Sequence, residues 1–466
     1  MVETMEEMPM TEYERRRLEN IKRNGDMLSS LNINSILSNL TDSSLKRPRG
    51  RPAGPREWQK RIYERSRSSL RTQGIPASHP SGLSYDKPCD LTTPLSNKEP
   101  ITMRNVYKDD EESHYSFVKR LRALEMNPVT NVGRVAVQEP VKPESFKLES
   151  ENVARIVPEG LTVIRFLPTS GTTVVVAGTR FGSLGVWAAT SRDANDIGKT
   201  VHLYRPHSST IYGIYVHPFS PTKIYSCCGD GLLRVTDIGT EKFDLLYSTS
   251  SGSAIYSLSQ PPDDVNSIYI GERLGLKLYD RRAGKIVNSW LLHKGRINSI
   301  DFNPSNTNVL ATTSTDGLAC LWDLRKINNR QSKCKPFLTF TREKSIHSAY
   351  FSPSGSCLAI TSSDHMIAVL GGADFDDNHI IYRGHSRNIP LCSRAIWGWD
   401  DTYLYMGCKK RRVEVLSVPQ RKTTATLESS LVSSLPFQFD AHPCKVGMLV
   451  GASSGGMAFL WTSRDC

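Results

Sequence analysis

From about residue 160 the chain alternates apolar and polar residues in short runs that are separated by turns. In the clearest stretch, the runs INSIDF (297–302), VLATTS (309–314) and LACLWDL (318–324) are joined by NPSNTN and by the tight turn TDG. Apolar residues at every second position, between turns rich in Asp, Gly and Pro, are typical of β-strands, because successive side chains of a strand point to opposite faces. The pattern therefore predicts a series of short strands joined by tight turns.

The same three-strand unit recurs seven times. The third strand of each unit carries an anchor residue, and successive anchors lie 43 to 49 residues apart: Trp187, Thr236, Tyr279, Trp322, Leu370, Leu416 and Trp461. Units of about 40–45 residues with endings like Trp-Asp resemble the WD-repeat family, whose repeats form four-stranded propeller blades. We therefore predict an all-β, seven-bladed WD-repeat β-propeller over residues 151–466.

The predicted ring needs one strand from elsewhere in the chain. Only five residues follow Trp461, so we expect the upstream segment ENVARIV (151–157) to supply the outer strand of the seventh blade. Closure of this kind hides sheet edges. Within the blades, polar residues at turns and blade starts have expected structural roles, as acceptors of backbone N–H groups or in ordering a blade. These residues are Asp230, Asp316, Asp364, His207 and His385.

Residues 1–150 differ in kind, because Ser, Pro, Asn and charged residues dominate and apolar periodicity is patchy. Such composition predicts a basic arm that is mostly disordered when free. Apolar spacing predicts short helices over 12–31, 57–71 and 115–126. Two roles for these helices stay open, binding of a partner and packing under the propeller.

The net charge is +12, and basic residues are concentrated in residues 43–73 of the arm, which hold ten Lys or Arg and two Glu, while residues 159–466 carry a further net charge of +8. This charge favours a polyanionic partner, with nucleic acid ahead of a membrane surface, although a solvated basic surface is the alternative. No apolar run is long enough to span a membrane. The cysteines lack zinc spacing, and no phosphate-binding loop or nucleophile motif is present. We therefore expect no metal, no cofactor and no enzymatic activity.

The arm contains the sharpest motif, Lys46-Arg47-Pro48-Arg49-Gly50-Arg51-Pro52, which resembles an AT-hook. A·T tracts narrow the minor groove and deepen its negative potential, which favours inserted guanidinium groups. Gly50 permits close approach of the backbone. The motif predicts DNA contact by Arg49, Gly50 and Arg51, with Arg47 on phosphates. A nuclear-import signal is the alternative, and the two roles are compatible.

In a propeller, the loops between second and third strands share one face with the loops between blades. Both loop classes are rich in basic residues here, and their convergence predicts a DNA-binding surface. The alternatives are a solvated rim and a surface for an acidic protein. The predicted DNA-binding residues are Arg180, Arg273, Lys409, Lys410, Arg411 and Arg412 in the first class and Lys294, Arg296, Arg342, Lys344 and Arg387 in the second, accompanied by Arg205, Arg383 and Arg394.

The opposite face carries Tyr279-Asp280-Arg281-Arg282 and Trp322-Asp323-Leu324-Arg325 in successive blades. These endings resemble the WD-x-Arg box of receptors for cullin-4 ubiquitin ligases, although Tyr replaces Trp in the first copy. The resemblance implies that Arg282 and Arg325, with Asp280 and Asp323, bind the adaptor, damage-specific DNA-binding protein 1. The alternative is that these Asp–Arg pairs only brace the blades.

Nearly the whole chain resembles one family. The opening TEYERRRLENIKRNGDMLSSLNI, the basic arm, YDRR, WDLR and GHSRNI are similar to WD repeat-containing protein 76 and its fungal DNA damage-binding counterpart, relatives of damage-specific DNA-binding protein 2. The resemblance implies nuclear localisation, DNA binding and a part in the DNA damage response. The aromatic wedge of the damage-binding relative has no equivalent here, because Phe437-Gln438-Phe439 is predicted to lie within a core strand.

The sequence therefore favours a nuclear DNA- or chromatin-binding protein that is a substrate receptor of a cullin-4 ligase. The alternative function is a scaffold for histone peptides or assembly that contacts DNA only through its arm.

Overall fold

The computed structural model describes residues 99–108, 111–125, 141–189, 201–216, 222–327, 334–383 and 393–463, together with five positions between 15 and 26. Those five positions are helical, within the helix predicted over 12–31. The helix predicted over 57–71 and the AT-hook-like motif lie outside the described residues. The chain divides into two compact units, Met1–Pro88 and Cys89–Cys466. None of the helices described is long and apolar enough to cross a membrane.

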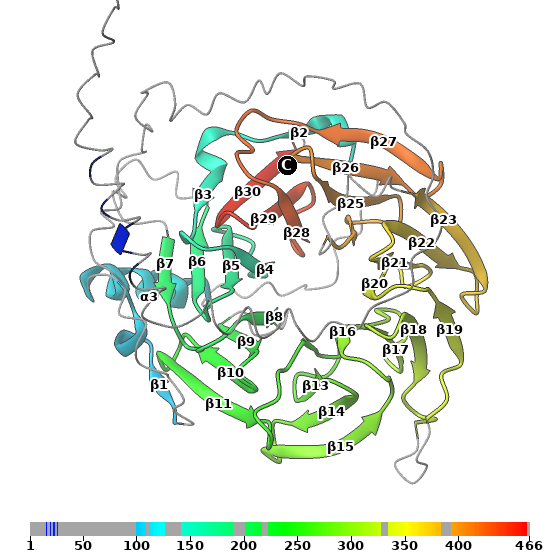
Figure 1. The fold of residues 1–466 in the computed structure, drawn as a ribbon, viewed down its shortest axis with the longest axis horizontal. Coiled ribbons are helices and arrows are strands. Elements are labelled where there is room, and N and C mark those ends of the chain that lie inside the picture. The colour runs from blue at the N-terminus through cyan, green and yellow to red at the C-terminus, as the bar shows by residue number, and fades with distance from the viewer. Residues whose placement is uncertain are drawn as a thin grey trace, which may run out of the picture. The chain divides into compact units, whose positions relative to one another are not determined.

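The second unit is a ring of seven antiparallel sheets, the blades, as predicted (Figure 1). From the axis outward, the strands of blades 1 to 3 are β4 (Leu161–Phe166), β5 (Val174–Thr179), β6 (Leu184–Ala188) and β7 (Val201–Tyr204); β8 (Ile211–Val216), β9 (Lys223–Cys228), β10 (Leu232–Asp237) and β11 (Lys242–Ser248); and β12 (Ser257–Ser259), β13 (Ser267–Gly271), β14 (Gly275–Asp280) and β15 (Lys285–Leu291). Those of blades 4 to 6 are β16 (Ile297–Phe302), β17 (Val309–Ser314), β18 (Leu318–Asp323) and β19 (Leu338–Thr341); β20 (Ile346–Phe351), β21 (Leu358–Ser362), β22 (Met366–Gly371) and β23 (Asp377–Arg383); and β24 (Ile396–Trp397), β25 (Tyr403–Cys408), β26 (Arg412–Ser417) and β27 (Lys422–Leu427). Blade 7 contributes β28 (Pro436–Ala441), β29 (Met448–Ser453) and β30 (Met457–Ser463).

The core lies between neighbouring blades. The second strands are buried along almost their whole length, whereas an outer strand such as β15 alternates between exposed positions and positions that are half-buried or, at Trp290, buried. One apolar cluster joins Val450 and Leu460 of blade 7 to Leu161, Val175 and other residues of blade 1. Because each sheet is covered on both faces only by its neighbours, the stability of every blade depends on the whole ring.

The upstream segment closes the ring, which confirms the closure predicted for residues 151–157. β3 (Val153–Arg155) pairs antiparallel with β30, and the preceding β2 (Phe146–Lys147) pairs with the end of the same strand. Ile156 continues the contact, since its N–H donates to the carbonyl of Gly456 and its buried side chain packs in the cluster between blades 7 and 1. A Cβ on Gly185 would clash with Ile156 Cγ2, so a glycine permits this approach.

Part of the predicted arm belongs to the propeller unit, which differs from the boundary placed at residue 151. β1 (Ile101–Thr102) pairs with β11 as a fifth strand of blade 2. The fully buried Arg234 of β10 donates a hydrogen bond from Nη1 to the carbonyl of Glu99. A buried guanidinium needs such acceptors. The segment therefore extends the sheet of blade 2 and also supplies a hydrogen-bond acceptor for the buried Arg234.

The helix predicted over 115–126 is confirmed as α3 (Glu111–Glu125), which begins four residues earlier. Glu111 and Glu112 in its first turn favour that start, because carboxylates stabilise a helix N-terminus. Phe117, Val118 and Leu121 pack into the core cluster of blades 1 and 2. One helix turn of apolar side chains was too short a signal to distinguish packing on the propeller from binding of a partner.

A chain of hydrogen bonds orders blade 4 around His293. Trp322 Nε1–H donates to Thr312 Oγ1, which lies 2.8 Å from His293 Nε2, and His293 Nδ1 lies 3.1 Å from Asp316 Oδ2. Asp316 also accepts the backbone N–H groups of Lys294 and Leu318, which fixes the turn. Asp230 and Asp364 accept N–H bonds in the matching turns. The predicted structural roles of these residues are therefore confirmed, whereas His385 lies outside the described residues.

We predict that Ile156→Ala lowers the free energy of unfolding by about 2–5 kcal/mol, because it removes buried methyl groups from the closure contact. The matched control is the neighbouring exposed Arg155→Ala, which should change it by less than about 0.5 kcal/mol. Denaturant unfolding measures both. Equal losses in the two variants would contradict closure by this segment.

We also predict that Asp316 makes stability depend on acid pH. Burial alone would raise the pKa of Asp316, but the hydrogen bonds from His293 and from two backbone N–H groups lower it to about 2. A carboxylate with a lowered folded-state pKa stabilises the fold above pH 4, and this stabilisation, about 2 kcal/mol, is lost as the pH falls from about 4 to about 2. Asp316→Asn should be less stable at pH 7 and should lose less on acidification. The exposed Asp374→Asn serves as the control, and identical pH profiles for the two variants would refute the assignment.

Candidate nucleic-acid interface

The two predicted loop classes form one face of the ring, and backbone hydrogen bonds join them. Arg180 N–H donates to the carbonyl of Gly160, Thr210 Oγ1 donates to the carbonyl of Arg180, and Gly229 N–H donates to the carbonyl of Thr210. This run connects the loops of blades 1 and 2. A second contact joins the two loop classes at blade 4, where the N–H of Arg342, directly after β19, donates to the carbonyl of Gly317 in the turn between β17 and β18. The loops are therefore held at fixed positions by the sheets beneath them.

This face, which we call the basic face, presents eight exposed basic residues of the predicted set. None of the eight forms an ion pair with any other described residue. They are Arg180, Arg273, Lys294, Arg296, Lys344, Lys409, Lys410 and Arg411. Their charge is consequently available to a partner.

Several other predicted residues differ from this group. Arg412 is the first residue of β26, and its guanidinium pairs with Glu428 at 2.7 Å and with Glu414 at 3.7 Å, so its charge is already compensated. Arg342 is half-buried and lies over the Phe340 ring, 4.8 Å from its centroid. Arg387 lies outside the described residues.

Two exposed apolar side chains on the same face were not found from the sequence. Phe181 is 48% exposed in the turn between β5 and β6, directly after Arg180, and Leu274 is 42% exposed in the turn between β13 and β14, directly after Arg273. Both turns therefore place a cation next to a large apolar group. The sequence did contain a signal for these two residues, which is a bulky apolar side chain at a tight-turn position where a polar residue is usual.

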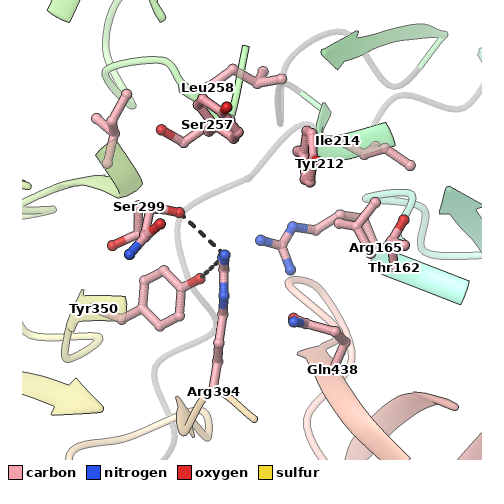
Figure 2. Close-up of a pocket in the computed structure, with 15 residues that line it drawn as sticks. Thr162, Arg165, Tyr212, Ile214, Ser257, Leu258, Ser299, Tyr350, Arg394 and Gln438 are labelled. Carbon is pink, nitrogen blue, oxygen red and sulfur yellow. Dashed lines mark hydrogen bonds between the residues drawn. The ribbon is translucent and has the colours of Figure 1, made fainter. Parts of the chain in front are cut away.

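The inner strands surround a pocket near the axis of the ring (Figure 2). Arg394 enters this pocket instead of extending outward with the other loop cations. Its Nη1 donates to Tyr350 Oη at 3.0 Å and its Nη2 donates to the carbonyl of Asn298 at 3.2 Å. Arg165 of β4 reaches the same pocket, a position that the strand pattern could not distinguish from an ordinary inner-strand residue.

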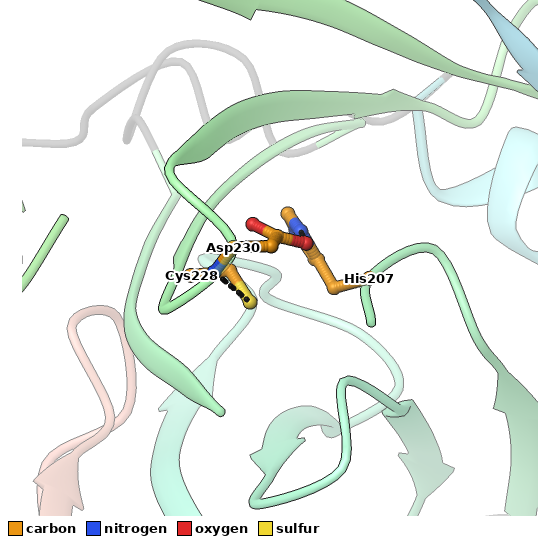
Figure 3. Close-up of side chains that lie close together, drawn as sticks. All are labelled: His207, Cys228 and Asp230. Atoms are coloured by element: carbon orange, nitrogen blue, oxygen red, sulfur yellow. Dashed lines mark hydrogen bonds and ion pairs between the residues drawn. The ribbon is translucent and has the colours of Figure 1, made fainter. Parts of the chain in front are cut away.

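His207, Cys228 and Asp230 lie close enough together to suggest a metal site (Figure 3). Hydrogen bonds occupy both ring nitrogens of His207, since Nδ1 lies 3.2 Å from Asp230 Oδ2 and Nε2 lies 2.9 Å from Ser226 Oγ. Cys228 Sγ accepts the N–H of Asp230, as Ser314 Oγ accepts that of Asp316 in blade 4. The cluster is thus the blade 2 copy of a structural network.

The opposite face carries the two WD-x-Arg-like endings on neighbouring blades. Asp280 Oδ1 accepts the backbone N–H groups of Arg282 and Ala283, and Arg282 is exposed. Asp323 holds Arg325 by two hydrogen bonds of 3.0 and 2.9 Å, with the Arg325 side chain 65% exposed. The aspartates therefore brace their turns, while both arginines remain accessible.

The segment Phe437-Gln438-Phe439 lies in β28, and Phe439 is fully buried against Trp461. Phe437 is half-buried in the same strand. This placement confirms the prediction that the segment is part of a strand and does not form a wedge.

Comparison with known proteins agrees with this fold. The family described as WD domain, G-beta repeat matches residues 198–237 and 284–323, which end at the aspartates that close β10 and β18. WD repeat-containing protein 76 of Xenopus laevis is 25% identical, covering 96% of this chain and 79% of the relative. DNA damage-binding protein CMR1 of Scheffersomyces stipitis is 26% identical, covering 70% and 72%. WD repeat-containing protein 76 of Mus musculus is 25% identical, covering 98% and 75%.

The similarity extends beyond the propeller, because a match over 96–98% of the chain includes most of the arm. The protein is therefore a WD-repeat β-propeller protein that is similar over nearly its whole length to WD repeat-containing protein 76 and, over most of it, to DNA damage-binding protein CMR1.

Proposed function

We propose that this protein binds duplex DNA and chromatin in the nucleus, as part of the DNA damage response, and that the basic face is its DNA-binding surface. The observation that carries the proposal is the convergence on one face of eight exposed basic residues from separate blades, none of which is ion-paired with another described residue. The name of the fungal relatives, DNA damage-binding protein, supports the same ligand.

The charge of this face suits a phosphate backbone. Each phosphate that a Lys or Arg neutralises releases condensed counterions, so affinity falls linearly with the logarithm of the salt concentration, by a slope of about 0.9 per contact. Such contacts position a duplex without reading its sequence. The rigid loops add to affinity because little ordering is needed when the ligand binds.

The arm is proposed to add a second contact of a different kind. The segment Arg49-Gly50-Arg51, between Pro48 and Pro52, fits a narrow minor groove. Groove width depends on base sequence, so this contact favours A·T-rich DNA, whereas phosphate contacts on the basic face do not.

We further propose that Arg282 and Arg325 bind the adaptor damage-specific DNA-binding protein 1, which would make the protein a receptor of a cullin-4 ligase. The supporting observation is that both arginines are exposed on neighbouring blades, on the face opposite the basic face. This separation leaves the basic face open to DNA when the adaptor is bound.

The alternative to binding by the basic face is a scaffold protein that contacts DNA only through its N-terminal arm. We predict that Lys409→Ala, Lys410→Ala and Arg411→Ala together weaken binding to A·T-rich and G·C-rich duplexes equally and flatten the salt slope by about 3. In contrast, Arg49→Ala with Arg51→Ala should weaken binding more on the A·T-rich duplex. Titration of the full chain on both duplexes at several salt concentrations measures these effects.

The control for the loop variant removes the same charge from the opposite face, by Lys285→Ala, Arg421→Ala and Lys422→Ala, and should leave the slope unchanged. Unaltered affinity in the loop variant, with loss of all binding in the arm variant, would instead support the scaffold function.

We predict that Arg282→Ala with Arg325→Ala abolishes co-purification of the adaptor without lowering the melting temperature, since both side chains are exposed. The matched control, Lys242→Ala with Lys422→Ala, removes two exposed cations from the same face on other blades. Equal recovery of the adaptor by both double variants would end the receptor proposal.

A further inference from the structure

The axial pocket is the feature that the proposed function leaves unused. It begins at the second residues of inner strands, such as Thr162 of β4 and Asn298 of β16, and ends at the fifth residues, Arg165 of β4 and Tyr350 of β20. The inner strands start at the basic face, so the end of the pocket that is lined by their second residues lies nearest that face. At about 3.3 Å per residue it is about 10 Å deep.

Two guanidinium groups face each other inside it (Figure 2). Both known hydrogen-bond partners of the Arg394 side chain, Tyr350 Oη and the carbonyl of Asn298, are neutral. Arg165 has two carboxylates nearby: Asp440, whose Oδ1 lies 3.5 Å from Nη1, and Asp301. Burial would lower the pKa of Arg165, but the negative charges of these two carboxylates raise it. Asp440 Oδ2 in addition accepts the N–H of Phe166 at 2.8 Å. The charge of Arg165 is therefore compensated by carboxylates, whereas the hydrogen-bond partners described for Arg394 are neutral.

Partly desolvated cations that repel each other are stabilised by an anion between them, and guanidinium forks match the oxygens of phosphate. The remaining lining is polar and includes hydroxyl and amide groups, of which the Ser257 hydroxyl donates to the carbonyl of Ile297 and the Ser299 hydroxyl is bonded to Thr313 Oγ1. Ser257, Ser299 and Gln438 supply such groups around the arginines.

We propose that the pocket holds the terminal phosphate of a DNA strand end. This inference rests on the proposed function, which brings DNA to the face nearest one end of the pocket. A pocket enclosed by blades admits the end of a strand, whereas an internal phosphodiester continues in both directions and carries a single charge. A terminal phosphomonoester carries nearly two charges, which matches the two guanidinium groups.

The mouth offers a place for the last base. Tyr212 and Tyr256, on neighbouring blades, line the pocket with their ring centroids 5.2 Å apart. Arg296 of the basic face lies over the Tyr256 ring, 5.3 Å from its centroid. Aromatic rings and guanidinium planes stack on bases of single-stranded ends without sequence preference.

The test uses the full chain and hairpin duplexes with a short single-stranded overhang that ends in phosphate or in hydroxyl, at the 5′ or the 3′ end. A dumbbell duplex, closed at both ends, measures binding to the face alone. Wild type should bind one of the phosphorylated ends about tenfold more tightly than its hydroxyl counterpart, which corresponds to about 1.4 kcal/mol. Arg394→Gln should remove this preference and leave affinity for the dumbbell unchanged.

A second measurement needs no DNA. Inorganic phosphate, compared with chloride at equal ionic strength, should raise the melting temperature of wild type more than that of Arg394→Gln, because the general salt effect acts on both proteins alike. This phosphate measurement still tests the pocket if the dumbbell does not bind. Failure of the dumbbell to bind would contradict only the proposed DNA-binding function. Conservative Arg394→Lys should retain part of the preference and replaces Arg394→Gln if the latter does not fold.

Equal affinity of wild type for phosphorylated and hydroxyl ends would overturn the strand-end proposal. So would tighter binding of a phosphoserine peptide than of the phosphorylated overhang, because the pocket would then serve a protein partner. Equal stabilisation of wild type and Arg394→Gln by inorganic phosphate would exclude an anion site altogether.

Discussion

Ring closure is the constraint on which the rest of this structure depends. Blade 7 has only β28, β29 and β30 from the end of the chain, and the upstream β2 and β3 complete it by pairing with β30. The pairing brings Ile156 and Val157 into the cluster that joins blades 7 and 1. If this contact opened, both blades would expose apolar faces and every loop on the basic face would lose its fixed position, because the loops are held only by the sheets below them.

Buried polar groups set the finer geometry. The networks of His207 with Asp230 and of His293 with Asp316 connect the start of a blade to the turn between its second and third strands. They therefore hold together the two loop classes that carry the basic residues. Arg234 instead couples blade 2 to the segment before the ring. Its guanidinium donates a hydrogen bond to the backbone carbonyl of Glu99 in that segment. Leaving either kind of group unpaired would cost more than an exposed ion pair contributes.

The fold separates the basic residues by face and by depth. Exposed cations lie on the basic face, the exposed Arg282 and Arg325 lie on the opposite face, and Arg165 and Arg394 lie inside. Arginines of one chain thus differ in role through their surroundings. Arg412 shows the same effect, since two glutamates compensate its charge although it adjoins three exposed cations in the sequence. Such sorting suits the proposed binding of DNA, because cations that are already paired add little to binding of phosphates.

The sequence by itself determined the number of blades, the strand order within each, the turn aspartates and the closure by residues 151–157. These features follow from a two-residue side-chain period and a repeat length, which are local and recur seven times. It also placed the basic loops on one face, because that follows from the strand order alone. Only the tertiary structure decided which of these cations face outward, since a side chain's direction and partners depend on residues far away in the chain. Arg394 turns inward because Tyr350 and Asn298, from blades 5 and 4, accept its N–H groups. The packing of β1 and α3 was likewise decided in three dimensions, because a two-residue strand and one apolar helix face gain their stability from blades 1 and 2 and not from their own sequence.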